Sequence, residues 1–445
     1  MNRVIEGLAG KFQVFRLNLR RILGGAVARN ALSLYSIRFA NYILPLITVP
    51  YLVRVLGAEE YGLLGFAQGL VAYFSVFVDY GFDWSATRMI SVGRDDPESV
   101  SRTAMAVWGA KFILLSVSII LLFPVTVLVT KVRTAAALVW IVFASLAGKV
   151  LFPTWLYQGL ERMTGIAIIN ISVRSAGLIA LILFVKQPKD LLLCAWILTI
   201  QSFLAGIFGV GWATLRLKIR WSMPSVSDIW GSLKNGLALF LSASATTLYT
   251  SGNAFLLGML VGDFSTVGYY VAAERLVRAA IDALGPISQA FFPKVANLAH
   301  ASKDLALREG RRILRVLAPL GAGIFVFTFA LAPEIVRIVF GTKFMPSVNV
   351  VRILSLCIPN VALATIWSTL MMLSFKRDYA VLIILFLAGI LNIALALLLA
   401  PIWGANGMAT GVVMAETFVN AASFIYTLKH GLNPARFRPA YVRNS

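Results

Sequence analysis

Charged side chains are scarce in this sequence. They make up 13% of its 445 residues, whereas a soluble domain carries about a quarter. Histidine is almost absent: His300 and His430 are the two in the chain, and both are expected in or near cytoplasmic loops. No Ser-His-Asp set can therefore be assembled, and the pair Asp95 and Asp96 lies in a loop with no sugar-nucleotide domain around it. We expect no enzyme.

Cysteine is also rare. Cys194 and Cys357 lie far apart, each within an apolar run. Two such thiols indicate core residues and give no disulfide or metal framework. We expect no metal and no cofactor.

Long apolar runs are what the sequence does contain. Hydrophobic residues make up 59% of the chain, and the mean hydropathy is +0.83. Runs such as 112–129 and 384–399 are apolar on nearly every side, unlike the alternating strands of a barrel. The pattern predicts an all-α integral membrane protein with twelve spans. They cover 31–53, 61–81, 104–130, 134–157, 164–185, 190–213, 235–261, 264–293, 313–340, 347–374, 379–400 and 404–428.

The net charge of +21 does not indicate nucleic-acid binding. The basic residues lie between apolar runs and concentrate in every second connecting segment, as expected for cytoplasmic loops. We therefore expect both termini in the cytoplasm. Residues 1–30 are predicted to form a basic amphipathic segment that lies on an anionic membrane leaflet. A disordered basic tail is the alternative.

An internal repeat is weakly visible. NALSLYS at 30–36 resembles NGLALFLS at 235–242, and 57–71 resembles 262–277; chance similarity between apolar segments is the alternative. A repeat predicts two six-helix lobes, at 31–213 and 235–428, related by a pseudo-two-fold axis along the membrane normal. A cytoplasmic linker at 214–234 would join them, and 429–445 would form a cytoplasmic tail.

Charges within the spans are costly unless they are paired or face water. The cations are Arg38, Lys111, Lys149, Arg174, Arg275, Arg278 and Arg352, and the anions are Asp79, Glu274, Asp282 and Glu416. From the helix rise, Arg174 lies about 15 Å and Glu416 about 18 Å into their spans. Arg352 is shallow and can snorkel to the outer surface.

The surplus of cations favours an anionic cargo, because arginine matches phosphate geometry and lysine acts as a point charge. Our candidates for binding a diphosphate are Arg38, Lys149, Arg174, Arg275 and Arg278. Local pairing of Glu274 and Asp282 with Arg278, at helical spacing, is the alternative for that residue. Glu416 or Asp79 is the candidate for a coupling proton or sodium ion.

Several motifs resemble a known family. They are LPLITVPYLVRVLG at 44–57, YGL at 61–63, DYGF at 79–82, SATR at 85–88, QGLER at 158–162, YYVAAERLV at 269–277 and PISQ at 286–289. Together they resemble Wzx-type polysaccharide flippases of the multidrug/oligosaccharidyl-lipid/polysaccharide exporter superfamily, with similarity running from about residue 28 to 430. The family's binding residues are not a fixed motif, so none is carried over.

The resemblance implies a V-shaped fold of two lobes in the bacterial inner membrane. It implies a cargo of oligosaccharide units on undecaprenyl diphosphate, such as O-antigen repeats, moved from the cytoplasmic to the periplasmic leaflet. Membrane lipids, a polysaccharide polymerase and a chain-length regulator are the implied partners. A multidrug exporter of the same superfamily is the first alternative. A membrane-embedded polymerase or ligase is the second, but the large periplasmic loop that it usually needs is missing.

Overall fold

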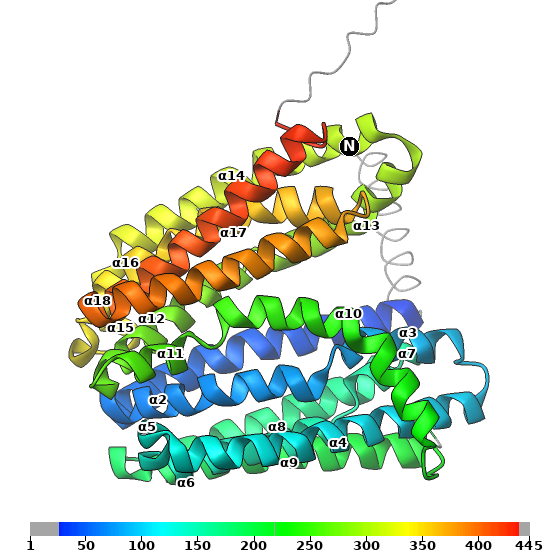
Figure 1. The fold of residues 1–445 in the computed structure, drawn as a ribbon, viewed down its shortest axis with the longest axis horizontal. Helices are drawn as coiled ribbons and strands as arrows, with labels where there is room; N and C mark the ends of the chain where they lie inside the picture. The colour runs from blue at the N-terminus through cyan, green and yellow to red at the C-terminus, as the bar shows by residue number, and fades with distance from the viewer. Residues whose placement is uncertain (1–25, 218, 436–445) are drawn as a thin grey trace, which may run out of the picture.

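The computed structural model describes residues 26–217 and 219–435. Side chains are described within these ranges except at 26–43, 242, 248, 249, 286 and 288–290. Most of the expected amphipathic segment 1–30 and the end of the predicted tail therefore lie outside the described residues. Over those residues the secondary structure is helical and contains no strand (Figure 1).

The N-terminal lobe contains eight α-helices within the described ranges, and a short 3-10 helix (Pro188–Asp190) precedes the last of them. They are α2 (Ala26–Asp79), α3 (Phe82–Val92), α4 (Pro97–Leu128), α5 (Thr130–Thr134), α6 (Ala136–Leu151), α7 (Thr154–Gly159), α8 (Met163–Phe184) and α9 (Leu191–Arg216). Pro153 stands at the break between α6 and α7, where a proline cannot donate the next helical hydrogen bond. The fourth span is therefore two helices joined at a kink.

The remaining helices begin with α10 (Val226–Thr250), α11 (Asn253–Leu260), α12 (Phe264–Asp282), α13 (Gly285–Ala301) and α14 (Lys303–Ala330). They continue with α15 (Ala332–Val339), α16 (Ser347–Ser355), α17 (Cys357–Ala364), a π-helical segment (Thr365–Leu373) and α18 (Asp378–Lys429). Cys194 and Cys357 are buried and unbonded, which confirms their assignment as core residues.

Two glycines let long helices double back. Gly57 interrupts α2 with φ 75° and ψ 179°, and Gly404 interrupts α18 with φ 55° and ψ −128°. A side chain is strained at such positive φ values, so glycine is the residue that fits these sharp turns. Each helix therefore crosses the membrane twice.

Eight helical stretches of the described residues are long and apolar enough to span a membrane. Two of them are the doubled helices α2 and α18. The broken and more polar pairs α10–α11 and α12–α13 supply two further crossings. The prediction of twelve spans in an all-α membrane protein is thus confirmed over the described part of the chain.

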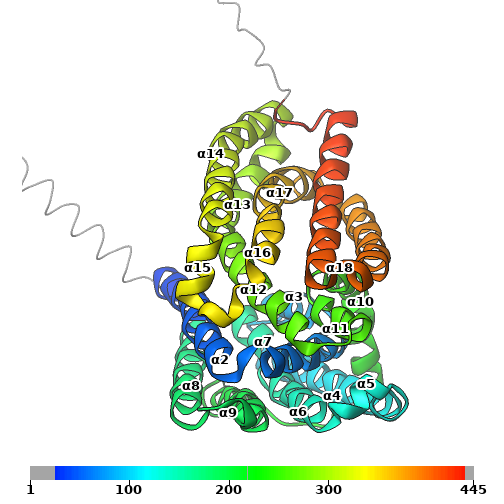
Figure 2. The same ribbon diagram turned by 90° about the vertical axis from the view of Figure 1, so that its left-hand side faces the viewer.

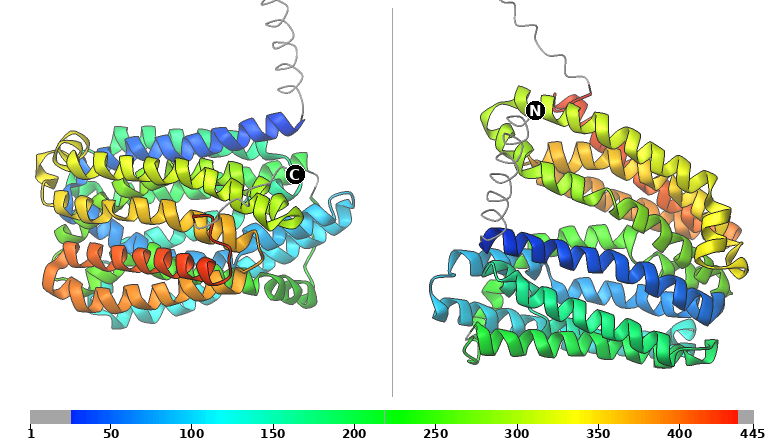
Figure 3. Two further views of the ribbon diagram at one scale, coloured as in Figure 1. Left: turned by 90° about the horizontal axis from the view of Figure 1, so that it is seen from above. Right: turned by 180° about the vertical axis from the view of Figure 1, so that it is seen from behind.

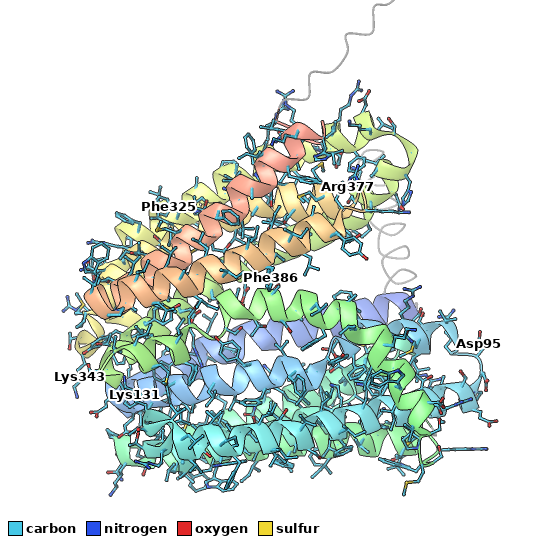
Figure 4. All side chains as sticks on the ribbon, in the orientation of Figure 1. Asp95, Lys131, Phe325, Lys343, Arg377 and Phe386 are labelled. Carbon is cyan, nitrogen blue, oxygen red and sulfur yellow. The ribbon has the colours of Figure 1, made fainter. Side chains whose placement is uncertain are left out.

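The two lobes form a wedge. They meet at the end that carries α5, α15 and α16, and they diverge toward the end that carries α3, α7 and α13 (Figures 1 and 3). The positive-inside rule predicts that the converging end is the outer one, and we call it the outer end. Lys131 and Lys343 lie at that end, and Asp95 and Arg377 at the opposite end (Figure 4). On that prediction the wedge faces inward.

Glycines bring the lobes into close contact. The part of α2 that follows Gly57 carries Gly62, Gly65 and Gly69 on one face, against α11 and α12. A Cβ atom on Gly62 would lie 1.9 Å from the carbonyl oxygen of Phe264, and one on Gly65 would lie 2.7 Å from Val271. Small residues let helix backbones approach closely in membranes. The converging end is therefore packed nearly backbone to backbone.

The predicted linker is docked on the N-terminal lobe. Trp221 stacks on Trp108 of α4, with 5.5 Å between the ring centroids. Arg102 of α4 donates two hydrogen bonds to the carboxylate of Asp228, at 2.9 and 2.7 Å. The start of α10 therefore follows the N-terminal lobe, although α10 belongs to the seventh span.

Candidate functional site

A cavity of about 850 Å³ opens within the wedge. Helices α2, α4, α6, α8 and α9 supply most of its walls. The other lobe contributes Thr247 and Ser251 at the end of α10 and Arg275 on α12. A ligand in this cavity would therefore touch both lobes.

The walls of the cavity carry a positive surplus. Four cationic side chains line it, Lys111, Lys149, Arg174 and Arg275, against two carboxylates, Asp79 and Asp83. The formal surplus is +2.

Two lysines are held by a polar chain on α2. Lys111 Nζ lies 3.0 Å from Asp79 Oδ1, and its side chain is 2% exposed. Ser75, one turn before Asp79, donates a hydrogen bond of 3.3 Å to Oδ2 and accepts one of 2.9 Å from Lys149 Nζ. The Asp79 carboxylate is thus paired with Lys111. Lys149 lines the cavity, and its hydrogen-bond partner, Ser75, is neutral.

Arg174 has fewer bonding partners than the other cations of the cavity. It is half-buried on α8, and its guanidinium has no hydrogen-bond or ion-pair partner among the described residues. Asn170, one turn earlier on α8, also lines the cavity, and its Oδ1 is buried without a partner. A buried polar group without a partner costs free energy, so both side chains are suited to a polar ligand.

Arg275 approaches the cavity from the opposite lobe. Its guanidinium donates a hydrogen bond to Gln68 Oε1 of α2 and lies 5.7 Å from the centroid of the Tyr61 ring. Both partners are neutral. The full positive charge therefore remains available to an anion.

The structure does not place Arg38, Arg278 or Glu416 on the wall of this cavity. The side chain of Arg38, in α2, is outside the described residues. Arg278 is not part of the cavity wall: it donates to Glu274 Oε1 at 3.0 Å and to the Thr250 carbonyl oxygen at 2.7 Å, as in the local-pairing alternative. Glu416 is half-buried in the C-terminal lobe, away from the cavity wall.

Some cavity residues escaped the sequence analysis. Lys111 was noted as a buried charge but not chosen, and Asp83, Gln68, Asn170 and Gln201 were not considered. The chain leaves the helical conformation at Tyr80 and Gly81, so spacing from Asp79 gave no signal for Asp83. Helical spacing did offer a signal for Asn170, because Arg174 follows it by four residues on α8. Residues so spaced share a helix face.

The outer end of the wedge is closed by cations of the N-terminal lobe. Lys131 Nζ donates to the carbonyl oxygens of Gly258, Met259 and Val261, at the C-terminus of α11. Arg54 donates to those of Ile338 and Val339, at the C-terminus of α15. Helix C-termini expose unpaired carbonyl groups and partial negative charge, which cations satisfy. We call these two residues the outer latch.

A two-lobed, twelve-span bundle with a cavity that contacts both lobes has the architecture of a membrane transporter. Residues 27–299 match the model of the polysaccharide biosynthesis protein family, Polysacc_synt. The match covers more than half of the sequence, so the chain belongs to this family.

A curated relative agrees with this assignment. The chain is 28% identical over 409 residues to a protein of Escherichia coli (strain K12) named "Putative O-antigen transporter". The alignment covers 92% of this chain and 98% of that protein.

Solved structures show the same fold. The lipid II flippase MurJ in an inward closed conformation superposes with a TM-score of 0.69 at 14% identity, covering 90% of this chain and 87% of MurJ. An inward-facing multidrug resistance MATE family transporter of the MOP superfamily gives 0.68 at 15% identity, covering 87% and 95%. These identities are too low to carry more than the fold.

Proposed function

We propose that this protein is a flippase for undecaprenyl-diphosphate-linked oligosaccharide repeat units. It moves them from the cytoplasmic to the periplasmic leaflet during assembly of a surface polysaccharide such as O-antigen. The observation that carries the proposal is the unpaired positive charge of Arg174 and Arg275 on opposite sides of one intramembrane cavity. Family membership and the name of the Escherichia coli relative support it. The protein acts as a transporter rather than an enzyme, in the bacterial inner membrane with both termini cytoplasmic.

The geometry supports an alternating-access mechanism. In the inward-facing wedge, Arg174, Arg275 and Lys149 hold the diphosphate, because guanidinium forks bind phosphate oxygens in pairs. Asn170 and Gln201 lie on the same walls and offer amide groups to sugar hydroxyls. The polyprenyl tail stays in lipid. Rocking of the lobes then opens the outer latch and releases the headgroup.

A proton or sodium ion supplies the driving force in this proposal. Asp79 is engaged by Lys111, whereas the Glu416 carboxylate has no hydrogen-bond or ion-pair partner among the described residues. Glu416 is therefore the better candidate of the two. A Glu416→Gln variant should retain cargo binding but lose the dependence of transport on an imposed ion gradient.

Reconstituted transport tests the function. Proteoliposomes would carry undecaprenyl diphosphate with a short oligosaccharide, and an external glycosidase would report sugars that reach the outer surface. Arg174→Ala and Arg275→Ala should lower the rate at least tenfold. Arg216→Gln is the matched control, because Arg216 lies on α9 over the ring of Trp212 and outside the cavity.

The same vesicles separate the transporter alternatives. A multidrug exporter for organic cations would move ethidium and leave the lipid-linked sugar in place. Ethidium transport without sugar exposure would refute the flippase proposal. Unchanged sugar exposure in both arginine variants would remove these residues from the mechanism.

A further inference from the structure

A second cavity lies in the outer half of the C-terminal lobe. Its volume is about 540 Å³, and it is a groove between α14 and α18 with α16 as its floor. Figure 2 shows α14 and α18 on either side of α16 at this end. Its lining is Phe329, Asn349, Arg352, Ile353, Leu356, Trp403, Asn406 and Thr410. No residue lines both cavities.

Two polar atoms in this groove lack partners. Arg352 Nε is buried without a hydrogen bond, and its guanidinium lies 5.6 Å from the centroid of the Phe329 ring. Asn406 Oδ1 is likewise buried and unpaired. Buried polar atoms are nearly always hydrogen-bonded in proteins, so a ligand that accepts from Arg352 would relieve this deficit.

The lining defines the chemistry of that ligand. It includes one cation and no acidic side chain, which favours an anion. Phe329, Ile353 and Leu356 provide an apolar wall, which favours an attached hydrocarbon chain. Arg352 lies five residues after Ser347, the first residue of α16, or about 8 Å along the helix axis. Trp403 is 58% exposed at the same end, as expected at a membrane interface.

We propose that this groove binds an anionic phospholipid of the outer leaflet. The phosphate contacts the Arg352 guanidinium, and an acyl chain lies along Phe329 and Leu356. The site is separate from the cargo cavity, and a lipid held there would anchor the C-terminal lobe to its leaflet.

Native mass spectrometry of the purified full chain in detergent tests the proposal. The probes are phosphatidylglycerol, phosphatidylcholine with the same acyl chains, inorganic phosphate and undecaprenyl diphosphate. We expect one phosphatidylglycerol to be retained in preference to phosphatidylcholine, and no effect of inorganic phosphate. Arg352→Gln should weaken that binding about tenfold, because a hydrogen-bonded charge is lost. Arg337→Gln should not, because Arg337 is an exposed arginine of α15 outside the groove.

Arg352→Lys keeps the positive charge and replaces the glutamine variant in the experiment if that variant fails to fold. It should bind phosphatidylglycerol more weakly than the wild type and more tightly than Arg352→Gln. Equal retention of both phospholipids would overturn the proposal, as would equal losses in Arg352→Gln and Arg337→Gln. Preferential retention of undecaprenyl diphosphate through Arg352 would overturn the phospholipid assignment and place a polyprenyl ligand there.

Discussion

Lys111 and Asp79 form an ion pair of unequal burial, in which the lysine side chain is 2% exposed and the aspartate 38%. The ammonium group is therefore sealed inside the N-terminal lobe, while the carboxylate reaches the wall of the cargo cavity. A pair of this kind does not respond symmetrically to the loss of its members, because the buried charge cannot be hydrated when it is left alone.

Asp79→Asn should consequently destabilise the protein more than Lys111→Met. The first variant leaves a buried ammonium group uncompensated, and we expect a loss of about 3–5 kcal/mol in the free energy of unfolding. The second leaves a carboxylate that water in the cavity can reach, with methionine filling the space, and it should cost less. Thermal unfolding of both variants in detergent, followed by circular dichroism, measures the order. A larger loss in Lys111→Met would show that the carboxylate is the less tolerant partner.

Removing the outer latch should shift the lobes toward an outward-open state. Lys131→Gln removes a charge from three carbonyl acceptors of the other lobe. Hydrogen bonds to charged groups are worth about 1.5–3 kcal/mol each, so we expect at least a tenfold rise in the ratio of open to closed outer ends. Arg54→Gln should act in the same direction.

Spin labels at positions 133 and 343, which are exposed on the two lobes at this end, can measure that shift. Both native cysteines would first be replaced. Double electron–electron resonance should show a longer interlabel distance gaining population in the Lys131→Gln protein. Lys189→Gln is the control, because Lys189 is an exposed lysine at the outer end of the N-terminal lobe and has no hydrogen bond or ion pair with the other lobe in the described part of the chain. An identical distance distribution with and without Lys131 would contradict the role of the latch.

Low pH should break the ion pair between Asp228 of the linker region and Arg102 of α4. Hydrogen bonds from Arg102 and Ser225 hold the pKa of Asp228 below its ordinary value. Because the folded-state pKa is depressed, this contribution to stability is present above the unfolded-state value of about 3.9. It is lost as the pH falls through the lower folded-state pKa.

The difference in melting temperature between the wild type and Asp228→Asn should therefore be constant near pH 7 and shrink below about pH 4. Asp95→Asn provides the comparison, because Asp95 is an exposed loop residue with no side-chain partner in the described part of the chain. The melting temperature of Asp95→Asn should stay close to that of the wild type at every pH. If the difference in melting temperature between the wild type and Asp228→Asn grew as the pH fell, the linkage would have the opposite sign, and this account would be refuted.

The spans were readable from sequence because hydropathy and helix length are local properties. The predicted spans leave loops at 54–60 and 401–403, whereas in the structure the helix resumes directly after a single residue with positive φ, Gly57 in α2 and Gly404 in α18. That outcome depends on the backbone conformation of one glycine in each helix. Hydropathy does not record backbone conformation.

The cavity was only partly predictable, since it depends on helix rotation and on contacts between distant segments. Depth and charge selected Lys149, Arg174 and Arg275, which come from α6, α8 and α12 and share one cavity. The same criteria selected Arg278, three residues after Arg275, yet that side chain turns toward Glu274. The predicted spans likewise leave Lys131 in the loop between 130 and 134 without a role, because the carbonyl groups that it caps are more than a hundred residues away in sequence.

The glycine contact between the lobes gives the most direct test of the closed outer end. Gly62→Ala would place a methyl group 1.9 Å from the Phe264 carbonyl oxygen and 2.6 Å from the Gly268 amide nitrogen, both backbone atoms that cannot rotate away. Overpacking of this kind costs about 1–3 kcal/mol, so the variant should lower the melting temperature and populate the longer outer distance in the spin-label experiment. Gly211→Ala is the matched control, because apart from its chain neighbours and the backbone of its own helix no described atom lies within 4 Å of the added Cβ. It should be neutral or slightly stabilising, since alanine favours helices over glycine by up to about 1 kcal/mol. If both alanines behaved alike, the outer ends of the lobes could not be packed as closely as this structure shows.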